Sequence, residues 1–352
     1  MARITTYEEI MRRSSTFVDD HILSLQFPGC EWGGYFLFAA LKGEGPCQAV
    51  NLGLLIGFMN GQDLRMPHMV GDPRRLVVIR SLICNGVSYR SPDETSYARS
   101  DLIYSRVNLD VQVADVARVC GSWPYFEFYF VDKTYDIIYD LKGKASCAHW
   151  LPDHIYSNIY SYVVFPDFAF QGSIIVKGNE HTVEGAGALD HVVGRALVSP
   201  SSPGVGFWHY EPIAWENGWT SNALYFIGAH GETVVAEGCM TIPDGSYHSC
   251  KKFVIEYLEW AEGGANSGTA DWTQLVPRAW RGIMEGSHGT LTYEARATEV
   301  VNPAGVPIRE ANSLFHTQGV FKRRGGETIT LRGKGYNEYM GGALDPSRFV
   351  HP

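Results

Sequence analysis

A period of two in the hydrophobic residues constrains the fold of this chain more than any other feature. The segment YFEFYFVD places Phe126, Phe128 and Phe130 on one face of an extended strand, with more polar residues between them. The segments HSCKKFVIEYLEW, GTLTYEARATEVV and ETITLRGKGY alternate in a similar way, and NALYFIGAHGETVVAEGCMTI predicts a hairpin that turns at His230-Gly231. Successive side chains of a strand point to opposite faces, so this period predicts antiparallel sheets.

Helical periods are rare, which predicts an all-β fold. Thr6 followed by Glu9 forms a capping box and predicts a short N-terminal helix, and WTQLVPRAWRGIME is a second, weaker helix candidate. One barrel rarely uses so many strands, so we expect two tandem antiparallel β-barrels or sandwiches. Glycines and the segment SPSSPGVG interrupt the strand pattern between about 175 and 205. The predicted domains are residues 1–190 and 191–352.

The composition of the chain and the absence of known cofactor motifs limit the classes of function that we expect. The chain is 45% hydrophobic, 13% aromatic and 19% charged, with a formal net charge of −9, which is typical of a globular protein. Its basic run Lys322-Arg323-Arg324 is better explained as a solvated strand end than as a nucleic-acid contact. No P-loop, dinucleotide fingerprint or standard zinc spacing occurs in the sequence. We therefore expect no cofactor, no metal and no nucleic-acid partner.

The cysteines and the apolar runs indicate where in the cell the protein is expected to lie. The seven cysteines form no C-x-x-C pair, which favours reduced thiols and a cytoplasmic protein. The opening MARITTYEEIMRR lacks the apolar core of a secretory signal, and the longest apolar runs are too short to span a bilayer as a helix. A homodimer is a candidate assembly.

Two groups of residues are candidates for chemistry. The segment VEGAGALDHVVGR holds Asp190 beside His191 between flexible glycines. Aromatic and titratable residues gather in GFWHYEPIAWENGW, and others lie near both ends of the chain. These substrate-binding candidates are Trp32, Tyr35, Trp208, His209, Tyr210, Trp215, Glu216, Trp219, His316 and Tyr336, with Glu211 in the same segment. Such rings can wall a pocket and stabilise a developing cation, and a His or Glu can move a proton. The alternative is ordinary aromatic packing at a barrel rim.

The segment GAGALDHVVGR, followed by a Trp-rich strand pair, resembles the G-x-G-Y-x-D-H-x-W-G region of the AttH/CrtC-like family. The match carries over Gly187, Asp190, His191 and Gly194, whereas Val193 stands where the family has tryptophan and no tyrosine occupies its position. That family includes carotenoid 1,2-hydratases, kievitone hydratase-like proteins and lipocalin-like Diels–Alderases. The resemblance implies two lipocalin-like β-barrels and cofactor-free hydration, isomerisation or cyclisation of hydrophobic substrates.

The sequence as a whole predicts a cofactor-independent lyase or isomerase that acts on a hydrophobic terpenoid, polyketide or aromatic molecule. Asp190 or His191 would transfer the proton. The main alternative is a non-catalytic, lipocalin-like carrier of an apolar ligand, which needs no titratable group in its cavity. An interaction module with an exposed sheet edge is a third alternative.

Asp190 and His191 are expected to be unequal, because a bend at Gly187 can aim only one of them at a substrate. Replacing a proton-transfer group should lower turnover by roughly 10²–10⁴-fold with little loss of stability. Replacing a buried structural partner should instead cost roughly 1–3 kcal/mol of folding free energy. Turnover and melting temperature of Asp190→Asn and His191→Ala distinguish the two roles, and normal values in both variants would exclude this segment from the site.

Overall fold

The computed structural model shows an all-β protein. It describes residues 32–59, 75–85, 87–90, 96–104, 109–122, 124–146, 149–151, 159–194, 205–228, 231–242, 247–263, 274–301 and 309–341. Besides strands, these residues form two 3-10 turns, η2 (Gly45–Cys47) and η4 (Arg99–Asp101), and no α-helix. The predicted N-terminal helix lies outside the described residues.

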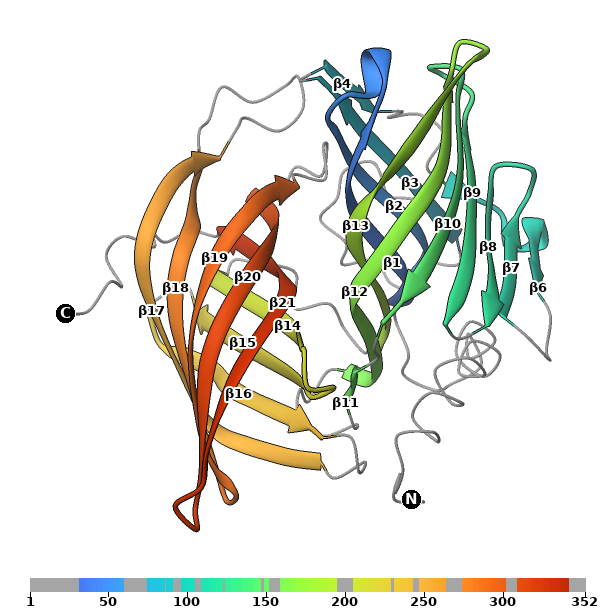
Figure 1. The fold of residues 1–352 in the computed structure, drawn as a ribbon. Coiled ribbons are helices and arrows are strands. Elements are labelled where there is room, and N and C mark those ends of the chain that lie inside the picture. The colour runs from blue at the N-terminus through green and yellow to red at the C-terminus, as the bar shows by residue number, and fades with distance from the viewer. Residues whose placement is uncertain are drawn as a thin grey trace. The chain divides into compact units, whose positions relative to one another are not determined.

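The N-terminal half forms a single 13-stranded sheet. Its main path runs in the order β4-β3-β2-β1-β13-β12-β10-β9-β8-β7-β6, and among the described strands this path does not close on itself (Figure 1). The strands are β1 (Trp32–Gly43), β2 (Val50–Met59), β3 (Arg75–Cys84), β4 (Val87–Arg90), β5 (Ser96–Tyr97), β6 (Leu102–Tyr104), β7 (Leu109–Val113), β8 (Ala117–Ser122), β9 (Tyr125–Asp132), β10 (Ile137–Ala145), β11 (His149–Leu151), β12 (Ile159–Val176) and β13 (Asn179–Gly194).

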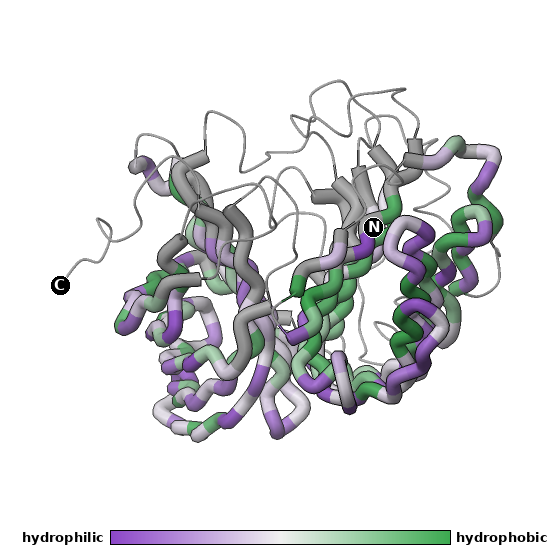
Figure 2. Tube along the Cα trace, turned by 90° about the horizontal axis from the view of Figure 1, so that it is seen from above, coloured by the Kyte–Doolittle hydropathy of each residue, from purple (hydrophilic) through white to green (hydrophobic). Residues whose placement is uncertain are grey.

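The predicted alternation is confirmed in β9 and β10. Phe126, Phe128 and Phe130 of β9 are buried, while Tyr125 and Tyr129 between them are exposed. In Figure 2, hydrophobic and hydrophilic residues are interspersed along the described chain. Phe168 of β12 lies in the middle of the buried face, with its ring 4.9 Å from that of Phe170 and 5.6 Å from that of Phe126.

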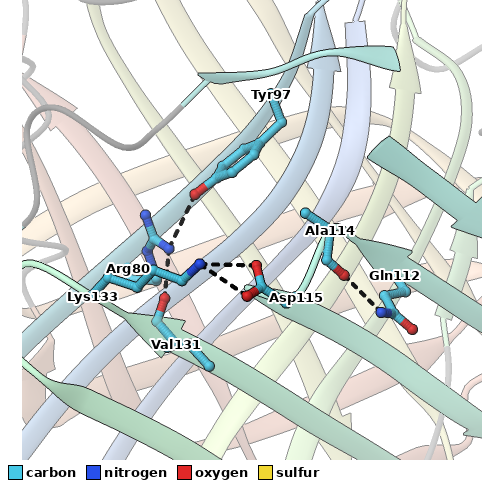
Figure 3. A network of polar contacts seen from close by, with 7 residues as sticks. All are labelled: Arg80, Tyr97, Gln112, Ala114, Asp115, Val131 and Lys133. Atoms are coloured by element: carbon cyan, nitrogen blue, oxygen red, sulfur yellow. Dashed lines mark hydrogen bonds and ion pairs between the residues drawn. The ribbon is translucent and has the colours of Figure 1, made fainter. Parts of the chain in front are cut away.

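A buried arginine shows how strongly this sheet curls. Arg80 of β3 is 2% exposed, and its Nη1 donates a hydrogen bond of 2.6 Å to the backbone oxygen of Val131 in β9 (Figure 3). In the sheet order, β2, β1, β13, β12 and β10 lie between these two strands. A flat sheet would hold them far apart, since neighbouring strands are about 4.8 Å apart. The sheet therefore bends into a half-barrel, with Arg80 on its concave side.

The C-terminal half forms a closed antiparallel barrel of eight strands (Figure 1). Its strands are β14 (Val205–Trp215), β15 (Thr220–Gly228), β16 (Thr233–Thr241), β17 (Tyr247–Gly263), β18 (Gln274–Gly286), β19 (Gly289–Val301), β20 (Arg309–Arg323) and β21 (Thr328–Gly341). Each pairs with the next along the chain, and β14 pairs with β21 to close the ring. The predicted β15–β16 hairpin is confirmed.

The second helix predicted from the sequence, in the C-terminal half, is wrong. From Gln274 onward, the helix candidate WTQLVPRAWRGIME belongs to the strand β18, which pairs with β17 and β19. Good helix formers such as Arg, Met and Glu are frequent in this segment. Tertiary pairing on both sides overrides that local preference, because it satisfies the backbone groups and buries Trp280 and Met284.

Strands β1 to β13 and β14 to β21 belong to two separate compact units. The change from one to the other lies between the end of β13 at Gly194 and the start of β14 at Val205. The domain boundary expected at residue 190 falls inside β13.

The packing of Phe168 leads to a testable expectation. Phe168→Ala should lower the free energy of unfolding by about 3–5 kcal/mol, because it empties the centre of the phenylalanine cluster. Tyr125→Ala, at a side chain 61% exposed on β9, should change it by less than about 0.5 kcal/mol. Urea unfolding followed by circular dichroism measures both, and equal losses would contradict the assigned core.

Candidate functional site

The two candidates from the sequence motif, Asp190 and His191, lie on the regular part of β13. Asp190 is 4% exposed and pairs with Phe36 of β1 and Val164 of β12. His191 pairs with Tyr35 and Val163, and its side chain lies outside the described residues. Neighbours on a regular strand belong to opposite faces, so the backbone of β13 places positions 190 and 191 on different faces of the sheet.

The bend expected in β13 at Gly187 is absent, since β13 pairs with β1 without a register shift. The pairing of β13 with β12 has two irregularities, and the one near Gly187 lies in β12 between Phe165 and Phe168. Pro166 lies between Phe165 and Phe168 and has no N–H for the ladder, which favours a bulge at that place. Gly187 instead permits close approach, because a Cβ atom there would overlap the backbone of Phe38 and Ala39.

A buried carboxyl group lies in the interior of the C-terminal barrel. Glu211 of β14 is 0% exposed. Its Oε2 accepts a hydrogen bond of 2.6 Å from Nε1 of Trp280 in β18, and its Oε1 accepts one from the hydroxyl of Tyr293 in β19. Neither strand is a sheet neighbour of β14, so both bonds cross the inside of the barrel. Glu211 thereby gains the donors that a buried carboxyl requires.

An imidazole and a phenol extend this cluster. His209, also 0% exposed, places its Nε2 3.3 Å from Oε2 of Glu211. Its Nδ1 lies 3.2 Å from the hydroxyl of Tyr257 in β17. If the Tyr257 hydroxyl donates to Nδ1, the ring proton is on Nε2, the nitrogen that lies near the carboxyl. Nε2 of His209 makes no hydrogen bond with a described residue, so one hydrogen bond and one close approach connect Glu211, His209 and Tyr257, the group called the relay below.

Both phenols of the cluster are weakened as acids. Burial raises the pKa of Tyr257 well above its ordinary value, and the nearby Tyr339 and Glu211 raise it further. Burial also raises the pKa of Tyr293 well above its ordinary value, and the charge of Glu211 and the hydrogen bond to it add to the effect. Both hydroxyls therefore keep their protons at neutral pH and serve as hydrogen-bond donors.

The relay leads toward one end of the barrel, which we call the Trp260 end. The ring of Trp260 lies 4.6 Å from that of Tyr257 and 5.8 Å from that of Tyr339. Trp260 is partly exposed, so the cluster approaches solvent here. Its Nε1 is buried and has no hydrogen-bond partner among the described residues. An indole N–H in this state is a donor that an oxygen atom of a ligand could satisfy.

The remaining candidates from the sequence are spread over the barrel. Trp215 faces the interior and donates from Nε1 to Ser221 at 3.0 Å, whereas Trp219 lies toward the opposite end. Tyr210 and Tyr336 form an edge-to-face pair of rings 5.9 Å apart. Glu216 and His316 are exposed. Tyr35 is buried in the N-terminal sheet, and the side chains of Trp32 and Trp208 lie outside the described residues.

Sequence reasoning selected His209 but missed its partners. Tyr257, Trp280 and Tyr293 come from three other strands, and no local motif connects them to His209. The available signal was the spacing within β14, where His209, Glu211, Ile213 and Trp215 share one face. Trp280 was hidden in the segment predicted to be helical.

Within the described residues, no group of three or more His, Cys, Asp and Glu side chains is arranged to hold a metal ion. The described part of the chain also contains no helix that is long and apolar enough to cross a membrane.

Comparison with known proteins defines the fold. No family model matches the chain, and no curated protein sequence is significantly similar to it. The crystal structure of an AttH candidate from Nitrosomonas europaea superposes with a TM-score of 0.57 at 13% identity, over 88% of this chain and 92% of that one. The crystal structure of kievitone hydratase from Nectria haematococca superposes with a TM-score of 0.52 at 10% sequence identity. The match covers 96% of this chain and 95% of the hydratase chain. The predicted resemblance to the AttH-like, lipocalin-like fold is thereby confirmed.

The hydrogen bond of Tyr293 leads to a stability prediction. Tyr293→Phe should lower the free energy of unfolding by about 1–3 kcal/mol, because Oε1 of buried Glu211 loses its donor. The same substitution at Tyr129, which is 40% exposed, should change it by less than about 0.5 kcal/mol. Chemical denaturation of the two variants gives the comparison, and similar values would show that the phenol does not stabilise the carboxyl.

Proposed function

We propose that this protein is a cofactor-independent lyase or isomerase whose reaction is a proton transfer on a hydrophobic small molecule. A terpenoid, polyketide or aromatic compound is the proposed substrate class. The observation that carries the proposal is the relay, in which the imidazole lies 3.3 Å from the carboxyl and is hydrogen-bonded to the phenol at 3.2 Å, inside an aromatic barrel. General acid–base chemistry needs titratable groups within hydrogen-bond reach of one another.

The relay can move a proton without leaving a charge on the phenol. A substrate bound at the Trp260 end would give its proton to the oxygen of Tyr257, whose own proton passes to Nδ1 of His209. The proton on Nε2 of His209 then passes to Oε2 of Glu211, 3.3 Å away, once the two groups turn to form the hydrogen bond that the described structure lacks. The net result is one proton moved from substrate to Glu211, and the reverse sequence protonates the substrate. Because burial disfavours a phenolate at Tyr257, a coupled transfer of this kind fits the site.

The surroundings of the relay support a hydrophobic substrate. Tyr257, Trp260 and Tyr339 supply ring faces, which can pack on an apolar molecule and stabilise a developing cation. The Nε1 of Trp260 supplies a donor for a substrate hydroxyl or carbonyl oxygen. Hydration, dehydration, isomerisation and cyclisation all use these elements. The shared fold with a hydratase supports the same class.

A carrier of an apolar ligand is the second candidate function. It is favoured by the complete protein partnering of Glu211, whose two carboxyl oxygens each have a donor from the barrel. A polar cluster satisfied in this way can serve packing alone. In that case the relay would stabilise the barrel, and a ligand would bind without being changed.

Tyr257→Phe tests the enzymatic proposal. The variant keeps the ring but removes the hydroxyl that connects His209 to the substrate, so turnover should fall by roughly 10²–10⁴-fold. The full chain is incubated in D₂O with a panel of terpenoid, polyketide and aromatic compounds, and products are followed by liquid chromatography and mass spectrometry. New products, with deuterium where a C–H bond forms, are expected only with an intact relay.

Tyr339→Phe is the matched control, because it keeps the ring at the same end of the barrel and leaves in place the Tyr257 hydroxyl that bonds to His209. It should keep most of the activity. Equal activity of wild type and Tyr257→Phe would exclude the relay from catalysis. Stoichiometric binding of a panel compound without any product would favour the carrier.

A further inference from the structure

A second feature of the barrel lies at the opposite end, which we call the Trp219 end. A pocket with a volume of about 280 Å³ opens there. It is lined by Trp219, Met240, Ile242, His248, His288, Phe321 and Arg323. None of these residues belongs to the relay or contacts Glu211 in its cluster. The pocket is therefore a separate site, and its function does not depend on the proposed reaction.

The lining divides into an apolar floor and a basic rim. Trp219 and Phe321 meet edge to face with ring centroids 5.3 Å apart, and Met240 and Ile242 adjoin them. His248 and His288 lie with their rings 3.9 Å apart, and Arg323 completes the rim. Among the described residues that line the pocket, none carries a carboxylate. This local excess of N–H donors contrasts with a chain whose net charge is −9.

A backbone hydrogen bond between the β18–β19 turn and the β20–β21 turn holds the rim in place. The N–H of Arg324 donates to the backbone oxygen of His288 at 3.0 Å, which ties the β20–β21 turn to the β18–β19 turn. Gly289 has a φ of +153°, and a Cβ atom there would crowd the backbone of Lys322 and the ring of Phe321. Arg323 is also oriented by Glu327, with its Nη1 3.2 Å from Oε2. The guanidinium keeps further N–H groups for another acceptor.

We propose that this pocket binds a small amphipathic anion, namely an aromatic or branched carboxylate. Its ring or branched end would lie on Trp219 and Phe321, and its carboxylate would meet the imidazoles and Arg323 at the rim. An apolar surface with a few convergent polar groups is the usual composition of a small-molecule site. Arginine is well suited to this role because its planar fork matches a carboxylate. In this proposal, Arg323, the central residue of the run Lys322-Arg323-Arg324, binds the carboxylate of the ligand.

The test compares a charged probe with its neutral counterpart. Isothermal titration calorimetry of the full chain with 2-naphthoate and with 2-naphthamide should show tighter binding of the carboxylate. Arg323→Gln should weaken the binding of 2-naphthoate by about threefold to fivefold, as expected for a partly exposed ion pair, and leave 2-naphthamide unchanged. Arg323→Gln combined with His288→Gln should weaken it by about tenfold. Both residues are exposed, so these variants should fold.

Arg324→Gln is the matched control, because Arg324 is the next exposed arginine along the chain and does not line the pocket. It should leave the affinity for 2-naphthoate unchanged. Equal affinity for the two probes, equal effects of Arg323→Gln and Arg324→Gln, or no binding of either probe would each overturn the proposal. Because the assay measures binding without turnover, its failure leaves the proposed proton transfer untouched.

Discussion

The pairing of β14 with β21 is the constraint on which the C-terminal barrel depends. It joins the first and last strands of this unit and removes both sheet edges. It also fixes which residues of β14 face inward, because β14 is held in register on both sides. A slip of one residue would turn Glu211 away from Trp280 and Tyr293. The position of the relay is therefore a property of barrel closure rather than of any local motif.

The partners of Glu211 explain why a carboxyl is tolerated in this interior. Glu211 and His209 are fully buried, and a carboxyl left without partners in such a place would cost several kcal/mol. Trp280 and Tyr293 contribute large apolar surfaces together with one donor each. They fill the barrel and solvate the carboxyl at the same time. Polar groups arranged in this way cannot reorganise freely, which is a condition for efficient proton transfer.

The strands were largely predictable, whereas the candidate site was not. Alternation identified β9, β19 and the β15–β16 hairpin, because one face of each must be buried. The local composition around Trp280 misled the prediction of β18, since strand pairing is decided by residues far away in the chain. His209 could be named from its aromatic neighbourhood. Tyr257 and Tyr293 could not, because only the order and register of the strands bring them to His209 and Glu211.

The contact between Gly282 and Tyr293 has an evolutionary consequence. These residues pair across β18 and β19, and a Cβ atom at Gly282 would overlap the phenol ring of Tyr293. A lineage could replace the glycine only after the tyrosine had become smaller, and that first step would remove the donor to Glu211. The two positions should thus covary with the residue at 211 among related barrels. Homologues with a side chain at position 282 should then have lost both the tyrosine and the acid.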